Sequence, residues 1–531
     1  MTEQTRKPPS DPGADTASAP ARRRFLKMAG VSALSLAIPF SLAGVRPAHA
    51  AGGQLRVRIG ADISMLDPAM IFQVENQTVA GHVFNGLMKY DQATNEIVPD
   101  LTRDLEISED GRTYTFHLHE GVQFHKGYGT LTSDDVRFSF ERVMDEATGS
   151  RYRGQLGSID SIETPDDLTV VIHLIEANSG FLHKVCAFNQ GWIVSRAAVE
   201  EKGEQFNLDP IGTGPFMFDS WTTGTMVRMV ANPDYFEGAP EVDEVVLRII
   251  RDETAAALAL EGGEIDIAFG LQQPEVIARL REASGVTMLA REANNTVNLV
   301  LNTSVPPLDD LRVRQAMIHA LDRQGLIDGF FRGTKAPSHS VLTQTFVEFT
   351  DDVPRYAYDP DKARALLAEA GAEGFEFELV TVALSPYDRF PVPMVEDLNA
   401  VGIRARMTVL ERGAYVQARS SGRVNSCITA VVGPPDPDSP LVTLYHTASF
   451  PPGLNTSRYE GVDDLLEAAA AEQDMDRRNE LYGDVLRRTM TDLPVIPLFA
   501  EQLFMAHSAR VEGLEQNSLF TVHTYSVSLA S

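Results

Sequence analysis

The chain of 531 residues is long enough for more than one lobe and a large hydrophobic core. Its 43% hydrophobic and 23% charged residues are ordinary for a soluble globular protein. The net charge of −28 argues against binding to nucleic acid or anionic membranes, and no segment after residue 50 reaches the roughly 18 consecutive apolar residues of a membrane helix.

The first 50 residues have the order of a secretory signal peptide and are not part of the fold. Three arginines at 22–24 precede an apolar run over 28–45, diluted by Gly, Ser and Pro, and an A-x-A cleavage site ends at Ala50. The paired arginines with Phe25 resemble a Tat signal, which exports proteins that have already folded. An uncleaved membrane anchor is the alternative, but the diluted run and the cleavage site argue against it. We therefore expect a periplasmic protein and, without a cysteine in this segment, no lipid attachment.

Residues 99–143 combine strand, turn and helix signals. Asp110-Gly111 is a hairpin turn signal between two short runs, 104–108 and 113–118, and the second alternates apolar and polar residues. A further turn is expected at 124–127. Residues 132–135 then have the composition of a helix cap.

Strand-like and helical segments are interleaved along the rest of the chain, without an internal repeat. Strands are expected at 169–174, 244–250, 297–301, 375–382 and 404–410. Helices are expected at 253–261, 311–327, 361–370 and 392–400, and Gly371 and Gly402 would end the last two. This pattern predicts an α/β fold in which helices pack on mixed sheets.

Short sequence words recur in a fixed order along the chain. They are Leu66-Asp67-Pro68, GVQFHKG at 121–127, Asp134-Asp135-Val136, GTGPF at 212–216, NPDYF at 232–236, GEID at 263–266, RVRQA at 312–316 and Tyr358-Asp359-Pro360. In this order they resemble the family 5 extracytoplasmic solute-binding proteins, which deliver peptides, nickel and related ligands to ABC importers. The resemblance extends over nearly the whole chain that follows the signal peptide.

The resemblance implies a two-lobed periplasmic binding protein with a ligand cleft and a subdomain inserted in the first lobe. Lobe I is expected at 51–85, 210–297 and 505–531, the inserted subdomain at 86–209 and lobe II at 298–504. The chain crossings near Val297-Asn298 and Leu503-Phe504 would form the hinge on which the lobes close.

No residue pattern indicates a catalytic or metal site. H-E-x-x-H, G-x-S-x-G and Walker motifs are absent, and the GTGP word at 212–215 continues into Pro rather than a helix, so it is not a phosphate loop. His117, His119, Glu120 and His125 could suggest zinc or nickel. A strand face and a turn explain these residues better. We expect no cofactor, no metal and no catalytic residue.

The two cysteines, Cys186 and Cys427, lie far apart in the sequence. The periplasm permits a disulfide, but two cysteines are too few for a disulfide scaffold or a cysteine-based metal site. We expect both to be buried small hydrophobic side chains, and whether they are bonded stays open.

The family resemblance also implies where ligand binds. In peptide receptors of the family, the segment after the first Asp-Pro pair holds ligand backbone, which here selects Phe72, Gln73 and Val74. Trp192 is a candidate to stack on ligand, with core packing as the alternative.

Lobe II departs from the family pattern at both charged anchors. Gly433 stands where an acid meets the ligand's amine, just before the matching Asp436, and Ser385 stands where dipeptide receptors carry an Arg, before the Pro-Tyr pair that ends at Tyr387. Asp436 could replace the missing acid and Arg389 the missing Arg, although Asp436 also suits a turn. Otherwise the ligand is a modified peptide, an opine, a glycoside or a metal–chelator complex, because a buried ammonium without a carboxylate is costly.

The expected function is that of the periplasmic binding component of an ABC transporter. It would capture a peptide-like or other small polar solute between its lobes and deliver it to the membrane permease, as a monomer and without catalysis. An extracytoplasmic hydrolase is one alternative, and a ligand sensor that acts through a receptor rather than a permease is another.

Overall fold

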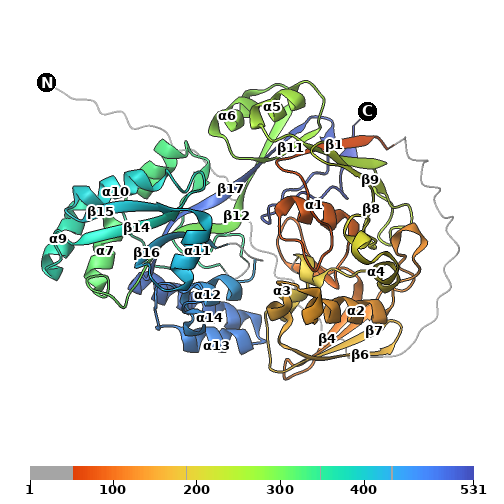
Figure 1. Cartoon of the computed structure of the whole chain (residues 1–531), viewed down its shortest axis with the longest axis horizontal. Helices are drawn as coiled ribbons and strands as arrows, with labels where there is room; N and C mark the ends of the chain where they lie inside the picture. The colour runs from red at the N-terminus through yellow and green to blue at the C-terminus, as the bar shows by residue number, and fades with distance from the viewer. Residues whose placement is uncertain (1–51, 187, 347–348, 432–434, 531) are drawn as a thin grey trace, which may run out of the picture. The chain divides into compact units, whose positions relative to one another are not determined.

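The computed structural model describes residues 52–186, 188–346, 349–431 and 435–530, and residues 49–531 form one compact unit. Its largest sheet has the strand order β15-β14-β16-β12-β17-β11-β1-β10-β9-β8, with β13 beside β17 (Figure 1). The strands are β1 (Gln54–Ile59), β8 (Phe216–Thr222), β9 (Met226–Ala231), β10 (Glu244–Ile249), β11 (Ile267–Leu271), β12 (Val286–Leu301), β13 (Lys335–Ala336), β14 (Glu376–Val382), β15 (Arg404–Leu410), β16 (Ser426–Val431) and β17 (Val495–Ser508). The sheet is mixed: β1 is parallel to β10 and β11, whereas β12 and β17 are antiparallel.

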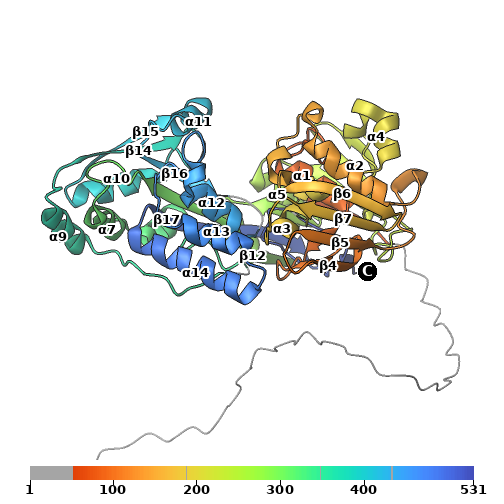
Figure 2. The ribbon, with the colours of Figure 1, turned by 90° about the horizontal axis from the view of Figure 1, so that it is seen from below.

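A second, antiparallel sheet has the order β4-β5-β7-β6 and is seen with α2 (Ser133–Met144) beside it in Figure 2. Its strands are β4 (Thr102–Ile107), β5 (Thr113–Leu118), β6 (Ile159–Asp166) and β7 (Thr169–Leu174). Tyr114, Phe116 and Leu118 are buried on one face of β5, as the alternation predicts. Thr132 and Asp135 form a capping box at the start of α2, which confirms the predicted cap.

The remaining helices and short strands complete the fold. The helices are α1 (Val74–Val83), α3 (Phe181–Cys186), α4 (Arg196–Lys202), α5 (Glu253–Glu261), α6 (Pro274–Glu282), α7 (Leu311–Ala320), α8 (Arg323–Gly325), α9 (Pro360–Ala370), α10 (Pro391–Ala400), α11 (Arg412–Ser420), α12 (Asp438–Tyr445), α13 (Asp463–Ala471) and α14 (Met475–Asp492). Two short pairs, β2 (Met88–Tyr90) with β3 (Ile97–Pro99) and β18 (Val511–Glu512) with β19 (Ser528–Leu529), stand apart from the larger sheets.

The buried apolar side chains fall into separate clusters that β12 and β17 connect. One cluster draws on residues 55–269 and 505–527, and a smaller one draws mainly on α5 and α6. Two others draw on residues 297–499 and lie under the helices from α7 to α14. The long strands β12 and β17 pair along most of their length and supply residues to clusters of both groups.

Most expected elements are present, but the helix predicted at 311–327 is interrupted after Ala320 and becomes helical again at Arg323. α7 ends at Ala320, and the Asp322 carboxylate then accepts the backbone N–H of Gly325 at 2.7 Å to start a new turn. The strand predicted at 297–301 is the end of the much longer β12. Gly371 ends α9 in the left-handed region, with φ 64°, as predicted.

The glycines of the GTGP word allow a close approach to the end of α1. A Cβ on Gly212 would lie 2.1 Å from the carbonyl oxygen of Val83, and one on Gly214 would lie 2.5 Å from that of His82. Gly214 also donates its N–H to Val83 at 2.8 Å. The word is therefore explained by backbone packing against α1.

The described residues test only some of the predictions about the cysteines, membrane helices and the signal peptide. Cys427 is buried and carries a free thiol, whereas the side chain of Cys186 lies outside the described residues. No helix in the described part of the chain is long and apolar enough to cross a membrane. The predicted signal peptide, at residues 1–50, also lies outside the described residues.

Candidate functional site

Two cavities border different faces of α1. The first has a volume of about 310 Å³ and is lined by Gln77 and Gly81, which share one face of the helix, and by Phe84, which follows it. The second has a volume of about 380 Å³ and is lined by Glu75 and Thr78 on another face. Both volumes lie in the range of small-molecule sites.

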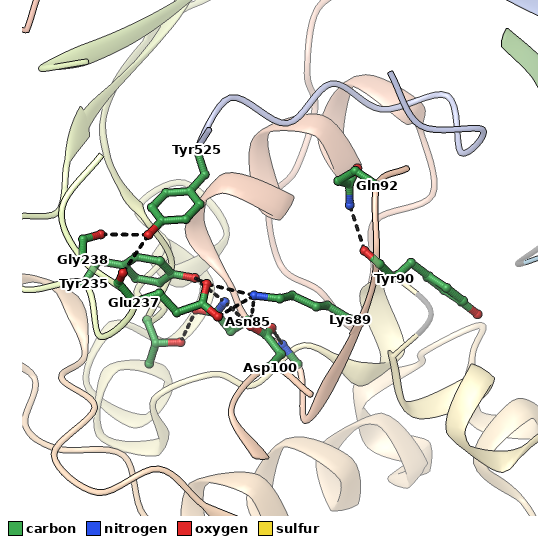
Figure 3. A network of polar contacts seen from close by, with 11 residues as sticks. Asn85, Lys89, Tyr90, Gln92, Asp100, Tyr235, Glu237, Gly238 and Tyr525 are labelled. Carbon is green, nitrogen blue, oxygen red and sulfur yellow. Dashed lines mark hydrogen bonds and ion pairs between the residues drawn. The ribbon is translucent and has the colours of Figure 1, made fainter. Parts of the chain in front are cut away.

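Several polar side chains in the wall of the first cavity contact one another, as Figure 3 shows. Lys89 Nζ lies 2.8 Å from Glu237 and 3.3 Å from the buried carboxylate of Asp100. Asn85 donates to Asp100 at 2.9 Å, and the Tyr525 hydroxyl donates to the carbonyl of Glu237 at 3.0 Å. Burial raises the pKa of Asp100, although Lys89 opposes this. The charges of Lys89, Asp100 and Glu237 are therefore already paired with one another.

Two histidines join α1 to the C-terminal segment beside this cavity. His82 donates to the carbonyl of Thr78 at 2.6 Å and accepts from the Thr524 hydroxyl at 2.9 Å, while its ring stacks at 6.0 Å on that of His523. Burial lowers the pKa of His82 to about 4 and that of His523 to about 3, with further lowering of the latter by His82 and Lys89. Both rings are therefore neutral at neutral pH.

The second cavity has charged walls of a different kind. It is lined by Arg58 of β1, Glu75 of α1, Glu253 of α5 and Glu501 of β17. Glu253 accepts the backbone N–H groups of Gln272 and Gln273 at 2.9 and 2.8 Å, and Glu501 pairs with Lys335. Arg58 and Glu75 form no ion pair within the part of the chain that the structure describes.

The segment predicted to hold ligand backbone immediately precedes and starts α1. Val74 is its first residue, is half-buried and lines the second cavity. Gln73 is exposed and accepts from the Ser64 hydroxyl at 3.0 Å. Phe72 is 46% exposed, and the guanidinium of Arg151 lies 4.0 Å from its ring centre. Of the three, Val74 alone lines one of the two cavities.

Trp192 lines the first cavity rather than the second. It is half-buried and stacks on Phe84 with ring centres 6.4 Å apart, and its backbone bridges to Gly86. It therefore combines a core contact with a cavity wall.

Tyr387 and Arg389 lie just before α10 and face different surroundings. Tyr387 is half-buried against Phe390, with ring centres 5.7 Å apart, and burial together with the nearby Glu501 raises its pKa. Arg389 is exposed, donates to the Ser385 hydroxyl and lies 3.6 Å from Asp388. Its guanidinium thus has a partner outside both cavities.

Asp436 is buried in an ion pair with a fully buried arginine. Arg478 of α14 donates to its carboxylate at 2.6 Å and to the Ser179 hydroxyl at 2.9 Å. Burial alone would raise the pKa of Asp436, but nearby His183 and Arg478 lower it. Burial lowers the pKa of His183, which disfavours the positive charge on its ring at neutral pH. We therefore assign the lowering of the Asp436 pKa to Arg478. Gly433, the other residue predicted here, lies outside the described residues.

The histidines considered as a metal cluster have separate environments. His125 is buried and contacts the carbonyl of Gly214 at 2.9 Å, whereas His117 lies 3.6 Å from Glu106 on the surface of β5. No group of three or more potential ligands gathers among the residues that the structure describes.

Sequence reasoning missed Arg58, Glu75 and Arg478. Arg58 alternates with buried Val57 and Ile59, a pattern that predicts an exposed strand face. Glu75 occupies the first turn of a helix, where acids are common for electrostatic reasons. No local signal marks either residue as part of a cavity.

Comparisons with known proteins agree with this architecture. Residues 96–451 match the bacterial extracellular solute-binding proteins, family 5 (middle region). The dipeptide-binding protein of Escherichia coli (strain K12) is 30% identical over 477 residues, covering 84% of this chain and 89% of that protein.

Solved structures give the same result. HbpA2 from Haemophilus parasuis matches with a TM-score of 0.85 at 28% identity, covering 90% of this chain and 100% of that one. The periplasmic binding protein DppA from Helicobacter pylori, in complex with the peptide STSA, matches with a TM-score of 0.75 at 29% identity, covering 90% and 98%. The fold is that of the two-lobed periplasmic binding proteins, and the chain belongs to the family 5 extracellular solute-binding proteins, the binding components of ABC transporters.

Proposed function

We propose that this protein is exported to the periplasm, captures a peptide-like solute and delivers it to an ABC permease, without a catalytic step of its own. The pair of cavities along α1, in a chain of this family, is the observation that carries the proposal. Peptide-like chemistry is supported by the E. coli dipeptide-binding protein and by the peptide-bound H. pylori DppA. Export by the Tat pathway rests on the paired arginines of the N-terminal segment, and a monomer is the simplest form of the receptor.

Among the residues predicted to bind ligand, Val74 and Trp192 have the strongest support because they line the two cavities. Phe72, Gln73 and Tyr387 would contact ligand at the edges. Arg389 would first have to leave Ser385 and Asp388, and Asp436 would have to leave Arg478. Gly433 brings no charge. The ligand's charged ends are therefore held elsewhere under this proposal.

The proposed lobes follow the sequence boundaries, with lobe I at 51–85, 210–297 and 505–531, an inserted subdomain at 86–209 and lobe II at 298–504. The separation of the buried clusters supports the division between lobe II and the rest of the chain, because one cluster combines residues of lobe I and of the inserted subdomain and others draw on residues 297–499. Bending of β12 and β17 near Val297 and Leu503 would then open and close the site.

Mass spectrometry of small molecules released from the denatured native protein tests the proposal. We expect short peptides or related solutes in stoichiometric amounts. A solute added back at about 100 times its dissociation constant should stabilise the protein by about 2.7 kcal/mol. Turnover of that solute by the purified protein would contradict the non-catalytic role.

A further inference from the structure

Arg58 is a buried cation that meets only backbone carbonyl groups. Its side chain donates to the carbonyl oxygens of Ile250 at 2.8 Å, Phe269 at 2.7 Å, Gly270 at 3.2 Å and Arg251 at 3.3 Å. The residue is 3% exposed. A buried charge is normally paired with an opposite charge, and no carboxylate of the described residues forms an ion pair with this guanidinium.

The unused hydrogen-bonding capacity of Arg58 lies beside the second cavity. Nη2 carries two hydrogens but has a single acceptor, the carbonyl oxygen of Arg251. A Cβ on Gly60 would lie 3.4 Å from this nitrogen, and one on Gly270 would lie 3.7 Å from Nη1. Both glycines line the cavity. With glycine at both positions, neither residue places a side chain over these two nitrogens.

Glu75 is the complementary anion in the same cavity. It is half-buried in the first turn of α1 and has neither a hydrogen bond nor an ion pair among the described residues. Burial lowers the pKa of Arg58, and the charges of Glu253, Glu75 and Asp252 oppose this from a distance. Glu253 already accepts two backbone N–H groups and Glu501 pairs with Lys335, so the remaining N–H of Arg58 Nη2 and the carboxylate of Glu75 are the charged groups of the cavity that stay available.

We infer that the second cavity binds both charged ends of a zwitterionic solute, an amino acid or a short peptide, with Arg58 taking the carboxylate and Glu75 the ammonium group. This assignment rests on the proposed function and deepens it, because it places the charged anchors on β1 and α1 instead of on Asp436 and Arg389. Nη2 offers its remaining N–H group to the carboxylate, and a hydrogen bond between a guanidinium and a carboxylate is charge-assisted and stronger than one between neutral groups.

A structural clamp is the competing explanation for Arg58. Arg323 illustrates it, since it joins the carbonyl groups of Ser338, Pro497 and Tyr356. A clamp predicts that substitution of Arg58 lowers stability but leaves ligand preference unchanged. A binding role predicts loss of preference for the free carboxylate, even in a variant that keeps every carbonyl contact.

Calorimetric titration of the full exported protein with alanyl-leucine, its C-terminal amide and its N-acetyl derivative separates these cases. We expect the wild type to prefer the free carboxylate over the amide by about 10- to 100-fold, the range for a charge-assisted contact in a cavity. Arg58→Met should abolish this preference. Gly60→Val should do the same by covering Nη2, while it keeps the guanidinium and its carbonyl partners. Glu75→Gln should abolish the preference for the free amine over the N-acetyl form.

Arg56→Met is the matched control, because Arg56 lies two residues away on β1 and pairs with Asp266 at 2.9 Å without lining the cavity. This variant should keep both preferences.

If Gly60→Val and Arg58→Met retain the carboxylate preference of the wild type, the inference is overturned and the proposed function stands. If the wild type does not bind alanyl-leucine although a solute is recovered from the native protein, the inference again fails alone. Absence of any bound or recovered solute overturns both.

Discussion

Two regions of this protein bury an arginine, and they satisfy its charge in opposite ways. Arg478 on α14 has no exposed surface and holds the carboxylate of Asp436 at 2.6 Å, whereas Arg58 on β1 is 3% exposed and has only carbonyl partners. The first charge is compensated within the protein. The second borders a cavity of about 380 Å³. An arginine with a complete set of partners is part of the framework, and one with an incomplete set beside a cavity is available to a ligand.

The contrast extends to the surroundings of each arginine. Around Arg478, the Ser179 hydroxyl and the backbone contact of Ser179 with Ala470 at 2.9 Å tie the 178–183 segment to α13 and α14. Around Arg58, two glycines leave space, and the neighbouring helix α1 carries the unpaired Glu75. Dense packing and full pairing mark the first region, and open space with unpaired charges marks the second.

Arg478→Met should give the largest effect that follows from this comparison. It leaves the Asp436 carboxylate buried without its cation, which costs about 3 to 5 kcal/mol of unfolding free energy. Chemical denaturation measures this loss. Arg477→Met is the matched control, since Arg477 is exposed and pairs with Glu480, so its effect should stay below about 0.5 kcal/mol. A loss in Arg478→Met no larger than that of the control would contradict a structural role for the pair.

As the pH falls from neutral, the buried histidine of α1 should lower the free energy of unfolding before Asp436, the partner of Arg478 on α14, does so. The pKa of His82 is lowered to about 4, below its ordinary value of about 6.5. The unfolded chain therefore binds the proton more tightly, so the stabilisation is complete above about pH 6.5 and is lost as the pH falls toward about 4. Asp436, whose pKa is lowered, loses its contribution only in stronger acid, as the pH falls below its ordinary value of about 4.

Denaturation curves between pH 7.5 and 5.5 test this difference. The wild type should lose about 4 kcal/mol, since a buried histidine whose pKa falls from about 6.5 to about 4 or below contributes about 1.4 kcal/mol over this pH range, and His82, His125 and His523 are three such residues. His82→Gln should remove about one third of this loss. A variant of His117, which is partly exposed on β5, should keep it. An equal slope in the two variants would show that His82 is not a source of the loss.

The sequence alone predicted the family and most helices and strands, but the charged residues of the second cavity could be recognised only in the folded structure. Words such as GTGP at 212–215 reflect local packing rules that any chain of this fold must satisfy, so they can be read without coordinates. The break of the predicted helix at Ala320 depends on one side-chain contact of Asp322, which competes with helical periodicity.

The charged residues of the cavity could not be predicted because each one looks ordinary by itself. Arg58 and Glu253 are far apart in sequence, and they meet only because β1 lies between β10 and β11. Asp436 shows the converse case. Its sequence context allowed either a ligand-binding acid or a turn residue, and the structure pairs it with Arg478, 42 residues away.

Arg58→Met should destabilise the protein less than Arg478→Met. The substitution leaves several carbonyl groups with fewer donors but no buried carboxylate without a cation, so we expect a loss of about 1 to 2 kcal/mol. The same denaturation experiment provides the measurement. A loss as large as that of Arg478→Met would mean that Arg58 is mainly a clamp between β10 and β11.

Arg389→Met should have the smallest effect of these substitutions. Its titration decides which arginine binds a ligand carboxylate. Arg389 is exposed and contacts Ser385 and Asp388, so its removal should change the dissociation constant of alanyl-leucine by less than about twofold, as for other exposed ion pairs. Titration of this variant beside Arg58→Met compares the two candidates directly. A loss of about tenfold or more in Arg389→Met, with Arg58→Met unchanged, would place the carboxylate before α10 and would return the charged anchor to lobe II.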